Sequence, residues 1–173
     1  MIQNDIQELP VCLNNLLKKN NWGVVSYTKL RKLKISEYDE IMKNNLGFVE
    51  LNKDGRYIIF YNDEVIVERQ RFTIAHEIGH ILLNHFNVPI ENREQEANMF
   101  AARLLMPICV LYECNIESID ELKRMCKVSS ISAFYRYNRL EMLKERNKFY
   151  TDKNEVVLRR KFKKFIKNYL KLK

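Results

Sequence analysis

Residues 73–83 read Thr73-Ile74-Ala75-His76-Glu77-Ile78-Gly79-His80-Ile81-Leu82-Leu83. In a helix, the four-residue spacing of His76 and His80 puts both imidazoles on one face, one turn apart. Two neutral imidazoles in that position can each give a nitrogen to one Zn²⁺ at about 2.0–2.1 Å. Glu77 lies beside the first histidine, where its carboxylate can take a proton from a metal-bound water. The segment therefore predicts a helix with two zinc ligands and a general base.

The alternative is that two histidines and a glutamate fall at this spacing on an ordinary amphipathic helix. Against it, the chain has only three histidines, and two of them are here. Their neighbours are apolar on nearly every side, so we expect the helix to be buried, and a metal ion would satisfy its buried polar groups. Gly79 costs up to about 1 kcal/mol of helix stability relative to Ala and is understandable where another group approaches closely.

The third ligand should come from a second helix, expected from about residue 92 or 93 to residue 105. A catalytic zinc needs three protein ligands and one open position. The candidates are His85, Glu91, Glu94 and Glu96. His85 follows His80 by five residues, about 140° round the same helix, so it cannot easily reach the same ion. A position at the helix end or on the surface fits His85 better.

Glu94 is the candidate that we favour. It shares one helical row with Asn98 and with the small residues Ala97 and Ala101, which would let the second helix pack closely on the first. Glu96 is about 200° away and faces elsewhere. The alternative for Glu94 is an ordinary first-turn acid that the helix dipole stabilises. Asn98 could accept the free N–H of a ligating histidine and so fix its tautomer.

A β-hairpin is expected just before the metal-binding helix. Residues 47–51 and 56–61 are rich in aromatic and β-branched side chains, and they flank Asn52-Lys53-Asp54-Gly55. Asp-Gly between two such runs is a good turn signal. The hairpin could hold an extended peptide by edge pairing, or it could be purely structural.

Shorter elements are expected before the hairpin. Apolar residues recur at helical spacing over residues 5–20, with Asp5 as a candidate N-cap and Pro10 as a break or a late start. Residues 22–27 fit a short strand and residues 36–42 a short helix. The whole pattern predicts an α+β fold, mainly helical, with a small antiparallel or mixed sheet before the metal-binding helix.

Composition fits one compact domain, or one with a small appendage, since 46% of the 173 residues are hydrophobic. Residues 144–173 hold 12 Lys/Arg and 3 Asp/Glu, a net charge of +9, whereas residues 1–143 carry −1. We therefore expect a single compact domain over residues 1–143 and a basic tail over residues 144–173. A chain that binds nucleic acid over its whole surface would not concentrate its charge in this way.

The sequence is typical of a cytoplasmic protein. The four cysteines show no C-x-x-C spacing, and we expect reduced thiols. No apolar run reaches the 18 or so residues of a membrane span. The start of the chain is polar and lacks a basic segment, so no targeting peptide is expected.

Residues 117–143 look like two helices joined by a turn near residues 127–129, which superficially resembles a helix-turn-helix that reads DNA. Apolar side chains at helical spacing would equally complete a core around the metal-binding helices, and we favour that interpretation. The tail continues as a basic amphipathic helix. We expect this helix to be docked on the domain. The alternatives are that it binds an acidic partner, contacts nucleic acid or stays loose. If residues 117–143 read DNA, the candidate contacts in the second helix of that pair are Tyr135, Arg136, Asn138 and Arg139.

The motif residues resemble the ImmA/IrrE family of metallopeptidases, which is gluzincin-like. The resemblance lies in Arg71-Phe72-Thr73-Ile74-Ala75-His76-Glu77-Ile78-Gly79-His80-Ile81-Leu82-Leu83 and in Glu94-x-x-Ala97-Asn98-x-Phe100-Ala101-Ala102-x-Leu104-Leu105-Met106-Pro107. It implies a zincin-like metalloprotease domain in which two histidines and a downstream glutamate hold Zn²⁺. By position, His76, His80 and Glu94 would be the ligands and Glu77 the general base, in agreement with the spacing.

Known members of that family are bacterial or belong to mobile elements, and they cleave a partner helix-turn-helix repressor of the Xre-like type. The resemblance therefore implies an antirepressor that acts in phage, mobile-element or stress regulation of transcription. The alternative is a non-proteolytic antirepressor or a DNA-binding regulator that acts through the helix-turn-helix-like segment and the basic tail. Nucleic acid is a less favoured partner, and no membrane is expected.

Overall fold

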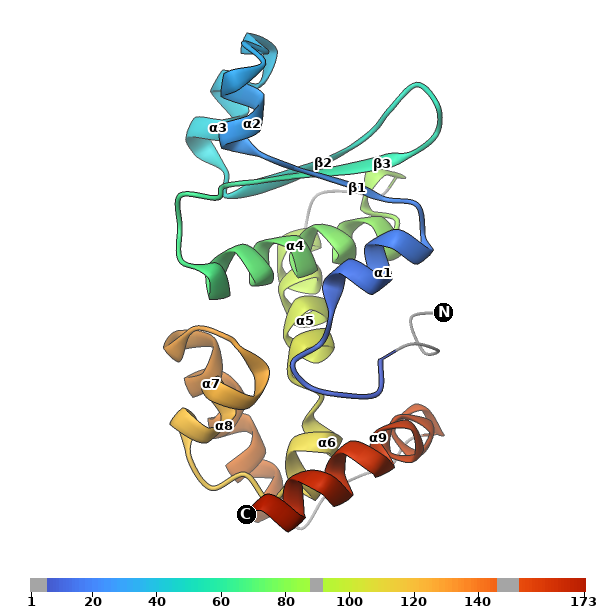
Figure 1. The fold of residues 1–173 in the computed structure, drawn as a ribbon, viewed down its shortest axis with the longest axis vertical. Coiled ribbons are helices and arrows are strands. Elements are labelled where there is room, and N and C mark those ends of the chain that lie inside the picture. The colour runs from blue at the N-terminus through green and yellow to red at the C-terminus, as the bar shows by residue number, and fades with distance from the viewer. Residues whose placement is uncertain (1–5, 88–91, 146–152) are drawn as a thin grey trace. The chain divides into compact units, whose positions relative to one another are not determined.

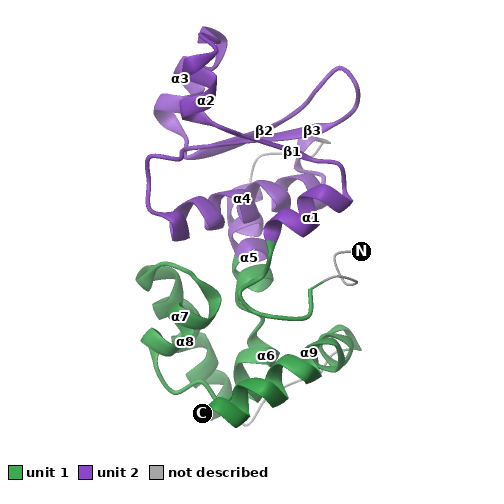
Figure 2. Cartoon of the chain, in the orientation of Figure 1, with its two compact units in different colours: residues 1–12, 102–173 green, residues 13–101 purple. Residues whose placement is uncertain are grey.

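The computed structural model describes residues 6–87, 92–145 and 153–173 (Figure 1). The chain divides into two compact units, one of residues 13–101 and one of residues 1–12 and 102–173 (Figure 2). The expected division into a single domain over residues 1–143 and a tail stays a prediction. Among the described residues, no helix combines the length and the apolar character that a membrane crossing needs.

The unit of residues 13–101 is built on a three-stranded mixed sheet. Its strands β1 (Gly23–Ser26), β2 (Gly47–Leu51) and β3 (Tyr57–Tyr61) lie in the order β1-β3-β2. β1 pairs with β3 in parallel and β2 pairs with β3 antiparallel, so β2 is an edge strand. The three predicted strands and the small mixed sheet are therefore confirmed.

The predicted turn closes the hairpin. The side-chain oxygen of Asn52 accepts hydrogen bonds from the backbone N–H groups of Asp54 and Arg56, at 3.0 and 2.8 Å. Gly55 has a φ of 73°, a left-handed conformation that glycine adopts without a steric penalty. Local turn chemistry therefore sets the register of β2 on β3.

Helices cover both faces of the sheet (Figure 1). α2 (Tyr27–Lys32) and α3 (Asp39–Asn44), with the 3₁₀ turn η2 (Ser36–Tyr38) between them, lie on one face. There the rings of Phe48 and Phe60 stack 4.6 Å apart in a core with Tyr27 and Leu30. α4 (Val67–Leu82) lies on the other face, toward which strand alternation directs the fully buried Ile59.

Two predicted helices, α1 (Leu13–Lys19) and α4, differ from the expectation at one end. The first, α1, begins after Pro10 rather than near residue 5, because proline cannot continue a helical hydrogen-bond ladder. Asp5, the expected N-cap, and Glu91, a candidate ligand, lie outside the described residues. The predicted second helix of the metal site is α5 (Arg93–Leu105), with the expected bounds, and the metal-binding helix α4 ends at Leu82 rather than at Asn84, the end that its periodicity predicts.

In the described part of the other unit, four helices follow α5. These are α6 (Ile108–Glu113), which the periodicity did not predict, α7 (Ile119–Cys126), α8 (Ser130–Glu145) and α9 (Lys153–Leu172). α7 begins at a predicted cap, where the Ser118 hydroxyl accepts from the Glu121 N–H at 3.2 Å. Lys127 follows α7 as its C-cap residue, and its φ of 50° turns the chain into α8. The predicted pair of helices is confirmed.

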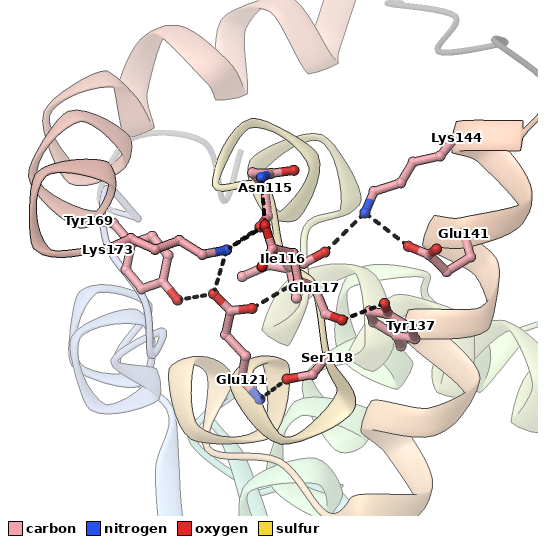
Figure 3. Close-up of polar contacts among 10 residues, drawn as sticks. All are labelled: Asn115, Ile116, Glu117, Ser118, Glu121, Tyr137, Glu141, Lys144, Tyr169 and Lys173. Carbon is pink, nitrogen blue, oxygen red and sulfur yellow. Dashed lines mark hydrogen bonds and ion pairs between the residues drawn. The ribbon is translucent and has the colours of Figure 1, made fainter.

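α9 is docked within its own unit. The Tyr169 hydroxyl donates to the Glu121 carboxylate at 2.7 Å, and the Lys173 ammonium lies 3.1 Å from the same carboxylate oxygen (Figure 3). Nearer the start of α9, Phe162 is fully buried and Arg159 pairs with Glu113 at 3.1 Å. The interpretation of the tail as a docked amphipathic helix is therefore confirmed for residues 153–173.

Candidate metal centre

Two helices of the unit 13–101 bring the predicted metal ligands together. α4 carries His76 and His80, whose Nε2 atoms lie 2.9 Å apart, and α5 carries Glu94. One Glu94 oxygen is 3.1 Å from the His76 Nε2 and the other is 3.3 Å from the His80 Nε2. One ligand atom from each of the three residues lies within 4.8 Å of the others.

The close crossing of α4 and α5 explains why Glu94 reaches the histidines. A β-carbon at Gly79 would lie 3.2 Å from the Cα of Ala97 and 3.1 Å from a ring carbon of Phe100, tighter than ordinary contact. Ala97 and Ala101 are fully buried. Small residues on both helices therefore let the two backbones approach, as the sequence predicted.

The outer nitrogen of His76 has the partner that the sequence predicted. Its Nδ1 lies 3.0 Å from the side-chain oxygen of Asn98, one turn after Glu94. An amide oxygen only accepts hydrogen bonds, so the His76 Nδ1 carries the proton and its Nε2 keeps the lone pair that a metal needs. The structure thus places Asn98 where the sequence analysis expected an outer partner of His76, and its positioning role stays a prediction.

His80 has an outer partner that the sequence analysis missed. The Nδ1 of His85 lies 2.9 Å from the Nδ1 of His80, and the His85 Nε2 lies 3.0 Å from a Glu96 oxygen. Of the two positions that we expected for His85, the helix end is right, since His85 follows directly after α4, and the surface is wrong, since its side chain is only 2% exposed. Glu96 does point away from the ligand cluster as predicted, but it binds His85.

The error has a local cause. The angle of about 140° assumed that His85 continues the helix of His80. Instead, α4 ends at Leu82, Asn84 adopts a φ of 55°, and His85 opens the 3₁₀ turn η3 (His85–Asn87). The reversal brings the His85 ring back against the His80 ring. The only signal in the sequence was an asparagine, a residue tolerant of positive φ, just before a third histidine.

Burial shifts the pKa values of His80 and Glu77 in opposite directions. The pKa of His80 is lowered to about 4, mainly by burial and secondly by the neighbouring His76. The His80 ring is therefore neutral at pH 7, the form that can ligate a metal. Burial first, and then the Glu94 charge, raise the pKa of Glu77 to about 8. A nearby divalent cation would favour the charged form of Glu77. The donor set therefore fits a metal ion electrostatically as well as geometrically.

The ligand cluster opens into a cleft of about 600 Å³. One wall is the edge strand β2 with the turn before it, and the other is α4. Glu94 is at the open side, since its side chain is 74% exposed, whereas Glu77 is buried. A β-carbon at Gly47 would lie 3.3 Å from a Glu77 oxygen, so that carboxylate sits against the start of β2. The side chains that line the cleft include Asn45, Phe48, Val49, Arg69, Phe72, Thr73, His76, Glu77, His80, Phe86, Glu94 and Asn98.

A pair of helix-borne histidines, a glutamate from the next helix and a buried glutamate beside a cleft define the site of a metallopeptidase. Comparison with known proteins agrees. Residues 33–138 match the family model of the IrrE N-terminal-like domain, and the chain belongs to this family, peptidase family M78. The expected ImmA/IrrE membership is thereby confirmed.

Two curated relatives are similar to the chain. A radiation response metalloprotease IrrE from Deinococcus deserti is 35% identical over 107 residues, which cover 48% of this chain and 38% of that protein. The protein of the same title from Deinococcus radiodurans is 33% identical over 116 residues, 53% of this chain and 35% of that protein. The aligned part of the chain thus spans little more than a third of the length of either relative.

Proposed function

We propose that this protein is a zinc-dependent endopeptidase that cleaves a partner helix-turn-helix repressor. The observation that carries the proposal is the convergence of His76, His80 and Glu94 at one wall of a cleft whose other wall is an edge strand. Two imidazoles and one carboxylate form a ligand set that catalytic zinc uses, with a position left for substrate or water. This argument supports zinc over Mg²⁺ or Ca²⁺, which prefer oxygen ligands.

In this proposal His76, His80 and Glu94 hold the zinc ion. When bound there, zinc would supply Lewis-acid chemistry, which polarises a carbonyl group and lowers the pKa of a water molecule. Glu77 is the general base, and later the acid that protonates the leaving amine. Its burial supports this role, because burial raises the pKa of Glu77 to about 8 and a bound divalent cation would lower it again, so that the carboxyl group could both take and return a proton.

The substrate binds as an extended segment along β2. An edge strand offers unpaired backbone N–H and C=O groups, which can pair with a peptide. β2 has β3 on one side only, and the cleft follows residues 44–49 toward Glu77. Phe72 and Phe86 also line the cleft, and Phe86 is 43% exposed. These rings favour a substrate with apolar side chains near the cleaved bond.

The identity of the substrate rests on the family resemblance described above. A helix-turn-helix repressor of the Xre-like type would be cut in the cytoplasm, and the genes under its control would be expressed. The protein would then act as an antirepressor in phage, mobile-element or stress regulation. Cleavage requires the repressor to expose an extended segment, because a helix cannot add a strand to β2.

Incubation of the zinc-loaded protein with a repressor encoded beside its gene tests the proposal. We expect two repressor fragments, and we expect Glu77→Gln to keep the metal while losing cleavage by about 10²–10⁴-fold, the usual contribution of a general base. His76→Ala should lose both the metal and the cleavage activity. Intact repressor in a tight complex with the zinc-loaded protein would instead support non-proteolytic sequestration.

DNA binding by the helix-turn-helix-like segment is the weaker hypothesis. Arg136 is a poorer candidate for a base contact than its neighbours, because its Nε donates to the Met106 carbonyl at 2.7 Å and its side chain is half-buried. Tyr135, Asn138 and Arg139 are exposed on α8. Salt-dependent DNA binding that disappears with Arg139→Ala would support this alternative.

A further inference from the structure

We infer that His85 and Glu96 are positioning residues for the metal ligand His80, which they orient through a continuous chain of hydrogen bonds. The inference rests on the proposed metal site. The first hydrogen bond joins the His80 Nδ1 and the His85 Nδ1 at 2.9 Å, and the second joins the His85 Nε2 and a Glu96 oxygen at 3.0 Å. The two rings meet edge to face, with centroids 5.0 Å apart and an angle of 75° between their planes.

Only one assignment of protons between two neutral rings satisfies both hydrogen bonds. If the His80 Nε2 gives its lone pair to a metal, the His80 Nδ1 carries the proton and donates to the His85 Nδ1. The His85 Nε2 then carries a proton and donates to the Glu96 carboxylate. The reverse assignment would protonate the ligating nitrogen of His80 and would set a lone pair of His85 against the carboxylate oxygen. The geometry thus matches the tautomer that metal binding requires.

The burial of His85 supports a positioning role. Its side chain is 2% exposed, so each ring nitrogen needs a protein partner, and each has one. A ring with both nitrogens engaged cannot rotate without losing a hydrogen bond. His85 therefore fixes the plane of His80, and the Glu96 carboxylate strengthens the chain because hydrogen bonds to charged groups are the stronger ones.

The two ligating histidines are held in different ways. Asn98 orients His76 through a single neutral hydrogen bond at 3.0 Å. His80 is oriented by a two-step chain that ends in a carboxylate on the first turn of α5, the helix that also provides Glu94. α5 thus provides the ligand Glu94, the outer partner Asn98 of His76, and the Glu96 carboxylate that binds His85 behind His80.

The alternative is that His85 merely fills space at the end of α4. Two substitutions separate the alternatives. His85→Leu keeps an apolar body of similar size and removes both hydrogen bonds, whereas His85→Asn places an oxygen acceptor close to the position of the His85 Nδ1. Because the Glu96 side chain is 55% exposed, Glu96→Ala leaves no buried cavity. Gln95→Ala is the matched control, since Gln95 is an exposed neighbour on the same turn of α5.

The first readout is zinc affinity, measured by competition with a chromophoric chelator. We expect His85→Leu to weaken zinc binding about 10–100-fold, the usual effect of losing an outer partner of a ligand. His85→Asn should recover most of the loss, Glu96→Ala should show a smaller loss, and Gln95→Ala should show none. Unchanged affinity in His85→Leu, or an equal loss in His85→Leu and His85→Asn, would overturn the inference.

The second readout uses the unmodified protein and does not depend on how a variant folds. Long-range ¹H–¹⁵N spectra of the zinc-loaded protein report which nitrogen of each histidine carries the proton. We expect the Nε2–H tautomer for His85 and the Nδ1–H tautomer for His80, and an Nδ1–H tautomer for His85 would refute the chain. Failure of the unmodified protein to bind zinc would reject the proposed function itself, which distinguishes the two failures.

Discussion

Gly47 of β2 faces Thr73 of α4 with no room between them for a β-carbon. A β-carbon at Gly47 would overlap the Thr73 methyl group and would lie 3.0 Å from the Phe60 carbonyl oxygen. The edge strand therefore lies directly against the helix that carries the histidines. This contact places the start of β2 beside Glu77, where a bound peptide would be cleaved.

Gly47→Ala should destabilise the fold. The added methyl group overpacks the contact between β2 and α4, and we expect the free energy of unfolding to fall by about 1–3 kcal/mol. Thr73→Ser in the same chain removes the overlapping methyl group and should restore part of the loss. Urea unfolding of the single and double variants measures both effects.

Gly23→Ala on β1 is the control for that substitution. A β-carbon at Gly23 would meet Ile58 at 3.4 Å, an ordinary van der Waals contact. Its effect should be clearly smaller than that of Gly47→Ala. Equal losses at the two positions would mean that the contact of Gly47 with Thr73 is not the cause.

Asn98→Ala should weaken metal binding. The His76 Nδ1–H donates to the Asn98 oxygen at 3.0 Å, and loss of such a partner usually costs about 10–100-fold in metal affinity. Asn98→Asp keeps an acceptor at the same place and should bind metal more tightly than Asn98→Ala. Chelator competition measures the three affinities, and equal affinities for the two variants would contradict the role of the acceptor.

Removal of the metal should lower the thermal stability of the protein. A ligand that binds only the folded state stabilises it by RT ln(1 + [L]/Kd), about 4 kcal/mol at a free concentration 1,000 times Kd. Differential scanning calorimetry with and without a chelator should therefore show a lower Tm after chelation. His80→Ala lacks one ligand, so its Tm should not respond, and an equal response in both proteins would argue against the site.

Glu121 should make stability depend on pH in the acidic range. Burial disfavours the charge of Glu121, but hydrogen bonds from the Glu117 N–H, the Tyr169 hydroxyl and the Lys173 ammonium outweigh it and hold the pKa of Glu121 below 4.5 (Figure 3). The unfolded chain then takes up the proton first as the pH falls. The stabilisation is therefore fully present above pH 4.5 and is lost as the pH falls through the lower pKa of the folded state.

Two measurements check this expectation. The stability difference between the wild type and Glu121→Gln should shrink as the pH falls below 4.5. An NMR titration should place the pKa of Glu121 below that value, and Tyr169→Phe should raise this pKa because one donor is lost. A carboxyl pKa at or above 4.5 in the wild type would contradict the assignment.

Much of the site could be predicted because its spacing is local. The positions of His76, Glu77 and His80 on one face follow from helical geometry alone. Glu94 and Asn98 could be selected because they share a row with Ala97 and Ala101, and only that row permits a close crossing of two helices. The hairpin followed from Asp54-Gly55 between two apolar runs.

Other features needed tertiary contacts. α6 has only six residues, too few for a helical period to be recognised. β2 could be recognised as a strand, but its position against Thr73 depends on the packing of α4 on the sheet.

Helical periodicity was thus enough to select the candidate metal ligands and Asn98, because all of them lie on regular helices whose geometry is the same in any fold. The contacts of His85 with His80 and Glu96 came from the folded structure alone. They arise where α4 has ended and Asn84 has reversed the chain, and a backbone reversal of that kind is set by what packs around it rather than by residue spacing.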